Sequence, residues 1–310
     1  VKPLKVDIPQ GRLTVVTGVS GSGKTTMVLE SLVPALENIS NQKKLPEHIL
    51  KIEADGIKQI KLIDATPIGI NIRSTVATYA NIHDELRKIY AKIAKTEGLS
   101  YKAGDFSYNT GNLRCPTCDG TGVINLHVQI LPDVDIPCPE CSGSRYAKAA
   151  EKVKYNGYSL PEIMAMDVTT ALKACKDLKI VQQKLQVLED LGLGYLTLGE
   201  ATPSLSGGEA QRLKLASEMR KAQSESVFVF DEPTIGLHPK DVETLLGVFQ
   251  TLIENGATVV VIEHDLDVIR NADYIIDMGP EGGDKGGEIV FCGTPDELKK
   301  CNASKTAKFI

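Results

Sequence analysis

One stretch decides the fold of this chain: Gly18-Val19-Ser20-Gly21-Ser22-Gly23-Lys24-Thr25-Thr26, which follows an apolar run and opens a helix-like segment that ends near residue 36. The spacing G-x-x-x-x-G-K-[ST] between a strand and a helix is that of a phosphate-binding loop, in which backbone N–H groups converge on phosphate oxygens. Gly21 and Gly23 permit the tight turn, Lys24 would reach the β- and γ-phosphates, and the hydroxyl of Thr25 would bind Mg²⁺. The alternative is a chance Gly- and Ser-rich turn. The predicted strand before the loop and the predicted helix after it argue against this alternative, because a phosphate-binding loop requires both and a chance turn requires neither. The stretch therefore predicts a nucleotide site made by Gly18, Ser20, Gly21, Ser22, Gly23, Lys24, Thr25 and Thr26.

Composition indicates a globular protein with one large domain or two of ordinary size. The chain has 310 residues, of which 42% are hydrophobic, and this is enough to bury a sizeable core. No apolar run reaches the roughly 18 residues of a membrane helix, and the first residues lack the apolar centre of a signal peptide. We therefore expect a cytoplasmic protein with no membrane partner, and the start without Met, one strand before the phosphate-binding loop, suggests a piece of a longer protein. The net charge of −5 argues against a broadly basic surface but leaves room for local basic patches.

The pattern along the chain predicts an α/β ATP-binding core that is interrupted by an insertion. Residues 1–73 read as strand, loop, helix and short strand, which is the first part of such a core. Residues 74–194 differ, because they combine Gly-containing turns and cysteines with helical patterns that continue over 159–191, and we expect an inserted helical domain. The core resumes over 195–310. The elements expected are strands at 61–63, 227–230, 258–262, 274–277 and 288–291, and helices at 83–96, 240–255 and 266–271. Strands without polar alternation predict a sheet that is buried on both faces.

The apolar strand 227–230 ends in two carboxylates, Asp231 and Glu232. Open α/β sheets bind their ligands at the carboxyl ends of the strands. Asp231 would hold Mg²⁺ there, and Glu232 would orient or deprotonate the attacking water. A solvated acidic turn is the alternative, and the phosphate-binding loop upstream argues against it.

Residues 205–211 read Leu-Ser-Gly-Gly-Glu-Ala-Gln and open a predicted helix that runs to about Arg220. Ser206 is placed to cap this helix. The backbone N–H groups at Ser206, Gly207 and Gly208 would form a second phosphate-binding helix start. An ordinary capped helix would have the same sequence features if this stretch stood alone.

Four of the seven cysteines form two C-x-x-C pairs, Cys115 with Cys118 and Cys138 with Cys141, and 19 residues separate the pairs. Two such knuckles at the base of a hairpin suit tetrahedral Zn²⁺ held by four thiolates. Because sulfur fills all four positions, the site would be structural and would have no open catalytic position. A redox site would instead be expected as one C-x-x-C near a βαβ unit. The tight turns of the knuckles would be permitted by Gly120, Gly122 and Gly143.

Taken together, the phosphate-binding loop, the L-S-G-G-E helix start, the acidic strand end and His264 after the next strand resemble the ATP-binding cassette family. In that family the signature helix of one cassette caps the γ-phosphate held by the loop of another cassette. The resemblance therefore implies a head-to-tail pair of cassettes. His264, which follows the apolar strand at 258–262, matches the family's switch histidine, which contacts the γ-phosphate. The resemblance implies an ATPase whose catalytic residues are Lys24, Glu232 and His264.

A cysteine hairpin between the phosphate-binding loop and the signature helix makes the resemblance more specific. The chain is similar to the C-terminal half of the UvrA family, a component of the bacterial excinuclease ABC complex, through essentially all of its length. Beyond the motifs above, the similarity rests on Pro67–Gly69, Phe106–Asn109, Leu131–Asp133, Leu205–Arg212, Gly236–His238, Val261–Ile269 and Gly279–Gly283. Such proteins are damage-sensing ATPases that bind DNA as dimers. The resemblance thus implies a role in nucleotide excision repair, with double-stranded DNA and the B component of the excinuclease as partners.

Two positions depart from the usual pattern of that family. The family usually has Asp-Gln-Ser-Pro where this chain has Asp-Ala65-Thr-Pro, so the glutamine that senses Mg²⁺ and water is absent. The hairpin carries Asn125 where repair members commonly have a lysine. A divergent relative serving antibiotic self-protection is one alternative function that would account for both. A DNA-independent module whose zinc hairpin binds protein is another.

Basic residues around the hairpin are the expected DNA contacts. The segment between Cys118 and Cys138 contains no Lys or Arg, whereas basic residues are concentrated on both flanks. We expect Arg145 and Lys148 to contribute more to DNA binding than any hairpin residue, His127 included, because affinity follows the number of phosphates neutralised. Solvated helix faces are the alternative for these flanks. Binding of duplex DNA by this half alone is expected to be weak.

Overall fold

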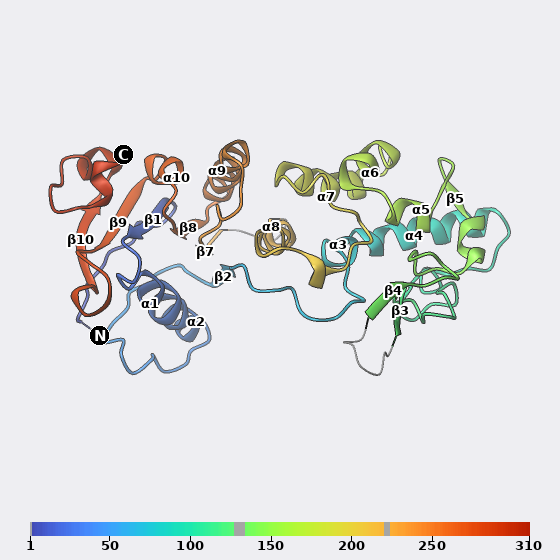
Figure 1. The fold of residues 1–310 in the computed structure, drawn as a ribbon, viewed down its shortest axis with the longest axis horizontal. Helices are drawn as coiled ribbons and strands as arrows, with labels where there is room; N and C mark the ends of the chain where they lie inside the picture. The colour runs from blue at the N-terminus through green and yellow to red at the C-terminus, as the bar shows by residue number, and fades with distance from the viewer. Residues whose placement is uncertain (1, 127–133, 220–223) are drawn as a thin grey trace. The chain divides into compact units, whose positions relative to one another are not determined.

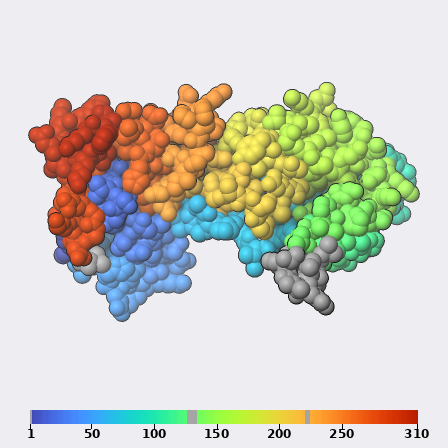
Figure 2. Space-filling view, in the orientation of Figure 1, coloured from blue at the N-terminus to red at the C-terminus, as the bar shows by residue number. Residues whose placement is uncertain are grey.

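The computed structural model describes residues 2–126, 134–219 and 224–310, and the chain divides into two compact units. Unit 1 comprises Val1–Thr66 and Glu218–Ile310, and unit 2 comprises Pro67–Ser217. The two ends of the chain therefore build one unit. Within it, the blue N-terminal segment and the orange-to-red C-terminal segment pack against each other (Figures 1 and 2).

Unit 1 is organised around a six-stranded sheet of order β10-β9-β1-β8-β7-β2. Strand β10 runs antiparallel to β9, and the other neighbouring strands are parallel. The strands are β1 (Leu13–Gly18), β2 (Gln59–Ile63), β7 (Ser226–Asp231), β8 (Thr258–Ile262), β9 (Tyr274–Gly279) and β10 (Glu288–Gly293). This arrangement confirms the predicted α/β class.

The central strands carry apolar side chains on both faces. Strand β8 reads Thr-Val-Val-Val-Ile and is buried at every position, as is β1. In register, Val16 of β1 lies between Ile262 of β8 and Ile276 of β9, and all three belong to one core cluster. Branched side chains pack well on a sheet that is covered on both sides. Edge strand β2 is partly exposed because it has only β7 as a neighbour.

The helix after the phosphate-binding loop contains a π-helical turn at Val28–Leu32, between α1 and α2. Such turns often occur near functional sites. The helical segment continues to Ser40, beyond the end near residue 36 that the sequence suggested. The helices of unit 1 are α1 (Lys24–Met27), α2 (Val33–Ser40), α9 (Pro239–Glu254), α10 (Leu266–Arg270) and α11 (Pro295–Leu298).

Unit 2 is mainly helical and carries two short hairpins. Its helices are α3 (Val76–Tyr79), α4 (Ile82–Thr96), α5 (Leu160–Met164), α6 (Val168–Ala174), α7 (Lys179–Asp190) and α8 (Gly207–Glu218), whose last residue is counted with unit 1. Its antiparallel pairs are β3 (Val123–Leu126) with β4 (Val134–Pro137), and β5 (Lys154–Tyr155) with β6 (Tyr158–Ser159). Helix α4 buries Ile82, Leu86, Tyr90 and Ala94, which are four residues apart and share one face.

The boundaries of the units differ from those expected from the sequence. The insertion was expected over 74–194, whereas unit 2 runs from Pro67 to Ser217 and therefore includes the signature segment. A hydrogen bond from the Tyr195 hydroxyl to Glu209 Oε1 (2.6 Å) contributes to this grouping, because it holds the first turn of α8 to the preceding loop. Some sequence predictions lie outside the described residues: the family motif Leu131–Asp133, His127, and the end of the signature helix at Arg220. Within the described ranges, no helix is both long and apolar enough to cross a membrane.

Candidate nucleotide site and metal centre

The phosphate-binding loop lies at the carboxyl end of β1, where the close approach of another strand requires glycine. Gly18 has φ 129°, and a Cβ atom there would lie 2.0 Å from the carbonyl oxygen of Met278 in β9. Any side chain would collide with that backbone. Gly21 and Gly23 also have positive φ, 73° and 99°, so the prediction that they allow the tight turn is confirmed.

Lys24 folds back over the loop that precedes it. Its Nζ donates hydrogen bonds to the carbonyl oxygens of Gly18 (3.1 Å) and Val19 (3.0 Å), and the side chain is buried. Burial lowers the pKa of Lys24, while the negative charges of Glu232 and Asp277 oppose that shift. The buried hydroxyl of Ser22 has no hydrogen-bond partner within the described chain. A buried ammonium and an unpaired hydroxyl in a loop of this shape suit a ligand with several phosphate oxygens.

A second glycine-rich segment supports the phosphate-binding loop from behind. Gly283 N–H donates to Gly21 O (3.1 Å), and Gly287 N–H donates to Ser22 O (2.9 Å). Gly282 approaches so closely that a Cβ there would lie 2.5 Å from the Ser20 carbonyl oxygen. In the sequence, part of this segment was noted only as a motif shared with the UvrA family. Its glycines could have predicted that another backbone approaches closely here.

The two carboxylates that follow β7 lie in different environments. The side chain of Glu232 is 40% exposed, and its Oε1 lies 3.5 Å from Nε2 of His264, so these two predicted catalytic residues are neighbours. Burial raises the pKa of Asp231, and the charges of Glu232, Asp64 and Glu263 raise it further. Carboxylates from the ends of three neighbouring strands are therefore crowded together, which is an environment that favours a bound cation. Asp231 and Thr25 would hold Mg²⁺ there.

The start of the signature helix lies in unit 2 and has the predicted cap. The backbone N–H of Glu209 donates to Ser206 Oγ (3.4 Å), and the Ser206 hydroxyl and N–H donate to Glu209 Oε2 (2.8 and 2.7 Å). This is a reciprocal capping box. Although burial opposes the shift, the hydrogen bonds from Tyr195 and Ser206 lower the pKa of Glu209. Ser206 and Gly207 are exposed and Gly208 is half-buried, so the first helical N–H groups can be reached by a ligand.

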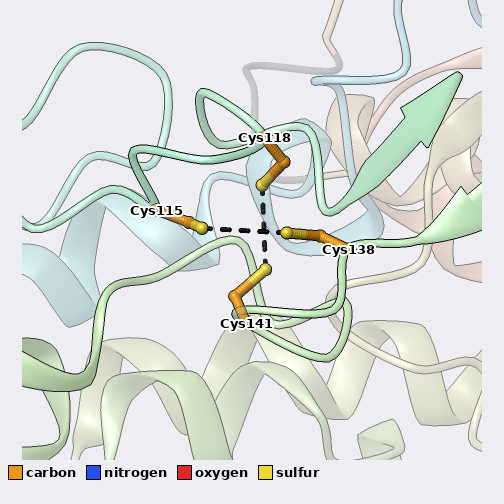
Figure 3. A group of neighbouring side chains, drawn as sticks. All are labelled: Cys115, Cys118, Cys138 and Cys141. Atoms are coloured by element: carbon orange, nitrogen blue, oxygen red, sulfur yellow. Dashed lines mark hydrogen bonds between the residues drawn. The ribbon is translucent and has the colours of Figure 1, made fainter.

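The four predicted zinc ligands converge on one point in unit 2. Their Sγ atoms all lie within 4.8 Å of one another, and Figure 3 shows the side chains of both knuckles directed toward a common centre. The Sγ atoms of Cys115 and Cys138 are 3.9 Å apart, and those of Cys118 and Cys141 are 3.7 Å apart. Tetrahedral Zn²⁺ with bonds of about 2.3 Å requires sulfur–sulfur distances of about 3.8 Å, whereas a disulfide requires about 2 Å. The arrangement fits a four-thiolate zinc site and excludes disulfides between these pairs.

Backbone N–H groups favour the thiolate of Cys138, whereas burial raises the pKa of Cys115 and of Cys141. A backbone N–H of Cys141 is the main cause that lowers the pKa of Cys138 to about 7. Gly122 N–H donates to Cys118 Sγ (3.3 Å). Gly120 has φ 77°, and a Cβ there would lie 1.7 Å from the carbonyl oxygen of Tyr108. The predicted need for glycine in the knuckles is therefore confirmed.

Comparisons with known proteins agree with this combination of sites. No family model matches the chain. The UvrABC system protein A of Staphylococcus aureus (strain COL) is 45% identical over 313 aligned positions, which cover 100% of this chain and 33% of that protein. The chain is homologous to part of UvrA. The corresponding protein of Synechocystis sp. is 44% identical over the whole chain and 32% of its own length. The crystal structure of UvrA2 from Deinococcus radiodurans matches 98% of this chain and 37% of that protein, with a TM-score of 0.89 and 39% identity.

The chain spans about one third of the length of the curated UvrA relatives that it matches. The match to the UvrA2 structure extends over 98% of the chain, so it includes residues of both units. The predicted resemblance to the UvrA family is thus confirmed for this portion. Activity, substrates and partners of a whole protein of this kind are proposals for this chain.

One DNA contact that was expected from the distribution of basic residues is corrected by the structure. Arg145 was expected to reach DNA, but it is only 7% exposed. Its guanidinium lies over the ring of Tyr108, 5.3 Å from the centroid, and donates to the carbonyl oxygen of Ile72 (3.1 Å). Arg145 therefore holds segments of unit 2 together. The sequence could not reveal this, because the residues that cover Arg145 are distant along the chain.

Proposed function

We propose that this chain is the C-terminal cassette half of a UvrA-type protein, and that it hydrolyses ATP in the recognition of damaged DNA during nucleotide excision repair. The observation that supports this most strongly is 45% identity to UvrABC system protein A along the entire chain. The phosphate-binding loop, the neighbouring Glu232 and His264 side chains and the four-cysteine cluster support the proposal further.

Each residue of the nucleotide site has a proposed role. Backbone N–H groups of residues 18–25 bind the phosphates, and Lys24 leaves its loop carbonyls to neutralise the β- and γ-phosphates. Thr25 and Asp231 would hold Mg²⁺, which would supply positive charge to the phosphate oxygens. Glu232 accepts a proton from the attacking water, and His264 contacts the γ-phosphate.

Ser206, Gly207 and Gly208 are proposed to bind the γ-phosphate held by a second cassette. An exposed helix start suits that role, because N–H groups at the start of a helix point toward a bound phosphate. The isolated chain would then hydrolyse ATP only when two cassettes meet head to tail. Zn²⁺ on the four cysteines would stabilise unit 2 and take no part in hydrolysis. Duplex DNA and the B component of the excinuclease are the proposed partners in a cytoplasmic repair complex.

The two alternatives have less support. A self-resistance ATPase and a DNA-independent zinc module were suggested by Ala65 and Asn125. The relatives reported above carry the name of the UvrABC system, which favours repair.

ATP turnover measured across a range of protein concentrations tests this proposal. We expect slow turnover per chain that rises with protein concentration, because each γ-phosphate needs a second cassette. Lys24→Ala should abolish nucleotide binding, whereas Glu232→Gln should retain binding and lower turnover by roughly 100-fold or more, since the proton acceptor is lost. Glu254→Gln, the same change at an exposed residue at the end of α9, is the matched control. Fast turnover that does not depend on concentration, or turnover that survives Lys24→Ala, would contradict the proposal.

A further inference from the structure

A buried carboxylate lies between the two segments that carry Glu232 and His264. Glu263 follows β8 directly and is 2% exposed. A carboxylate in such a place is costly unless hydrogen bonds replace its hydration. Its backbone N–H donates to Val16 O (3.1 Å), so it is also tied to the strand that leads into the phosphate-binding loop.

Each oxygen of Glu263 accepts hydrogen bonds from a different segment. Oε1 accepts from the backbone N–H of Thr234 (2.8 Å) and from the Thr234 hydroxyl (2.5 Å). Oε2 accepts from the backbone N–H groups of His264 (2.6 Å) and Asp265 (3.0 Å). Thr234 stands two residues after Glu232, so one carboxylate joins the Glu232 segment to the His264 segment.

These contacts also define what Glu263 does not do. An ionised carboxylate has about four acceptor positions, and four donors occupy those of Glu263. It therefore has no capacity left for a metal ion or for a water proton, in contrast to the half-exposed Glu232.

We propose that Glu263 is a positioning residue, which fixes the spacing between Glu232 and His264 so that the water-activating and phosphate-contacting groups are set together. This rests on the ATPase function proposed above and goes beyond it. Misplacement of a reacting group by about 1 Å can cost on the order of 100-fold in rate. Such a residue should affect the chemical step more than nucleotide binding.

Glu263→Gln tests the proposal with almost no change in side-chain size. The amide replaces one acceptor oxygen by an NH₂ donor, so both donors of one of the two segments lose their shared acceptor. We expect kcat for ATP to fall roughly 10- to 100-fold, with KM within about threefold, because the phosphate-binding loop is unchanged. Asp273→Asn is the matched control: Asp273 Oδ2 accepts from the backbone N–H of Leu13 (2.8 Å) at the opposite end of β1. Its kcat should stay within about twofold of the original.

Two further comparisons separate positioning from general stability. Thr234→Val removes one donor to Oε1 and should lower kcat, whereas Thr234→Ser keeps the hydroxyl and should retain it. In a chain that already carries His264→Ala, Glu263→Gln should lower kcat by less than about threefold, because one of the two groups whose spacing Glu263 fixes is gone. The proposal would be overturned if Glu263→Gln lowered kcat by the same factor with and without His264→Ala, or if it left kcat unchanged.

Amide hydrogen exchange, read by NMR, gives an answer even if the chain shows no ATP turnover. The N–H groups of Thr234, His264 and Asp265 should be protected in the original chain and in Asp273→Asn. In Glu263→Gln the N–H groups of the segment that faces the new NH₂ group, either Thr234 or His264 with Asp265, should exchange at least tenfold faster. If the chain shows no ATP turnover but does show this exchange pattern, the proposed ATPase function is refuted, and the link that Glu263 makes between the Glu232 and His264 segments stands. Unchanged exchange in Glu263→Gln would refute that link itself.

Discussion

Glu232, the proposed water-activating residue, holds a backbone conformation that side chains rarely adopt. Its φ is 46°, in the left-handed region, where a non-glycine residue costs roughly 1–3 kcal/mol. Its N–H donates to Ile262 O (2.9 Å), which ties the strained residue to the end of β8. Strain of this kind persists where the surrounding contacts over-determine it, and it is typical of functional sites. With this backbone conformation, Oε1 of Glu232 lies 3.5 Å from Nε2 of His264.

Ala65 stands where UvrA-type sequences usually have glutamine, one residue after Asp64. It is exposed, and the charge of Asp64 is felt by Asp231, so position 65 lies next to the proposed Mg²⁺ site. We expect Ala65→Gln to raise ATP turnover roughly 10- to 100-fold by adding a polar group that positions metal and water.

The control for this change is Ala65→Leu, which adds similar bulk without polar atoms and should not raise turnover. Both variants are measured at a protein concentration where turnover per chain no longer rises. Equal turnover in the glutamine variant and the original chain would mean that another residue already fills this role.

His83 is a buried histidine with a defined proton. The hydroxyl of Tyr146 donates to Phe106 O (3.0 Å), so the 2.7 Å contact between Tyr146 and His83 Nε2 requires Nε2–H as the donor. Burial is the main cause that lowers the pKa of His83 to about 3; the charge of Arg87 adds to this shift and the charge of Asp84 opposes it. His83 is therefore a structural residue of unit 2.

This histidine predicts how stability depends on pH. In the unfolded chain a histidine takes up a proton near pH 6.5, whereas folded His83 remains neutral until about pH 3. Unfolding therefore takes up a proton throughout this window, and stability falls as the pH is lowered from 6.5, by about 1.4 kcal/mol per pH unit. The Cε1–H signal of His83, assigned with His83→Gln, should stay that of neutral imidazole down to pH 5. A midpoint between pH 6 and 7 would contradict this.

At the scale of elements, the central strands of unit 1 were predictable because each is a run of consecutive apolar residues, which is the pattern of a strand buried on both faces. Strand β8 was expected at 258–262 and is found there, and helix α4 begins one residue before its expected start. Apolar runs and four-residue spacings are local signals. The helical pattern at 159–191 comprises three helices, α5 to α7; Ser159 caps the first and Asp167 caps the second, whereas the third starts after Leu178 without a side-chain cap.

The parts that could not be predicted depend on contacts between distant residues. Glu263 was passed over because nothing in the sequence shows that Thr234 reaches it from 29 residues away. Arg145 was predicted to contact DNA because the sequence does not show whether an arginine is buried or exposed. The four cysteines were predictable, since metal-ligand spacing is itself a local pattern.

The cysteine cluster is an element whose stability should depend on zinc. We expect one Zn²⁺ per purified chain by elemental analysis, and its removal by a chelator should loosen the β3–β4 hairpin, because metal binding contributes to folding free energy. Cys138→Ser should lose the metal. Cys292→Ser, the same change at an exposed cysteine outside the cluster, should keep it. A metal content near zero in protein never exposed to chelator would refute this site.

At the scale of the whole molecule, the charge of the chain limits how DNA can bind. The net charge is −5, so any DNA contact must come from a local group of basic residues. Near the knuckles, Arg73 and Arg114 are engaged with the carboxylate of Asp119 (3.0 Å each), and Arg145 is buried. Three exposed lysines lie within 13 residues after the second knuckle: Lys148 and Lys152 on the 3₁₀ helix Lys148–Lys152, and Lys154 on β5.

The chain should bind duplex DNA weakly at low salt and lose most of that affinity at physiological ionic strength. Each phosphate contact contributes about 0.9 to the slope of log affinity against log salt concentration. Replacing Lys148, Lys152 and Lys154 together by glutamine should therefore lower the slope by up to about 2.7, whereas the same replacement of exposed Lys43, Lys44 and Lys305 in unit 1 should leave it unchanged. Arg145→Gln should destabilise unit 2 with little direct effect on the slope. Fluorescence anisotropy with a labelled duplex measures both quantities, and tight binding that persists at physiological salt, or an unchanged slope in the first triple variant, would show that DNA binds elsewhere.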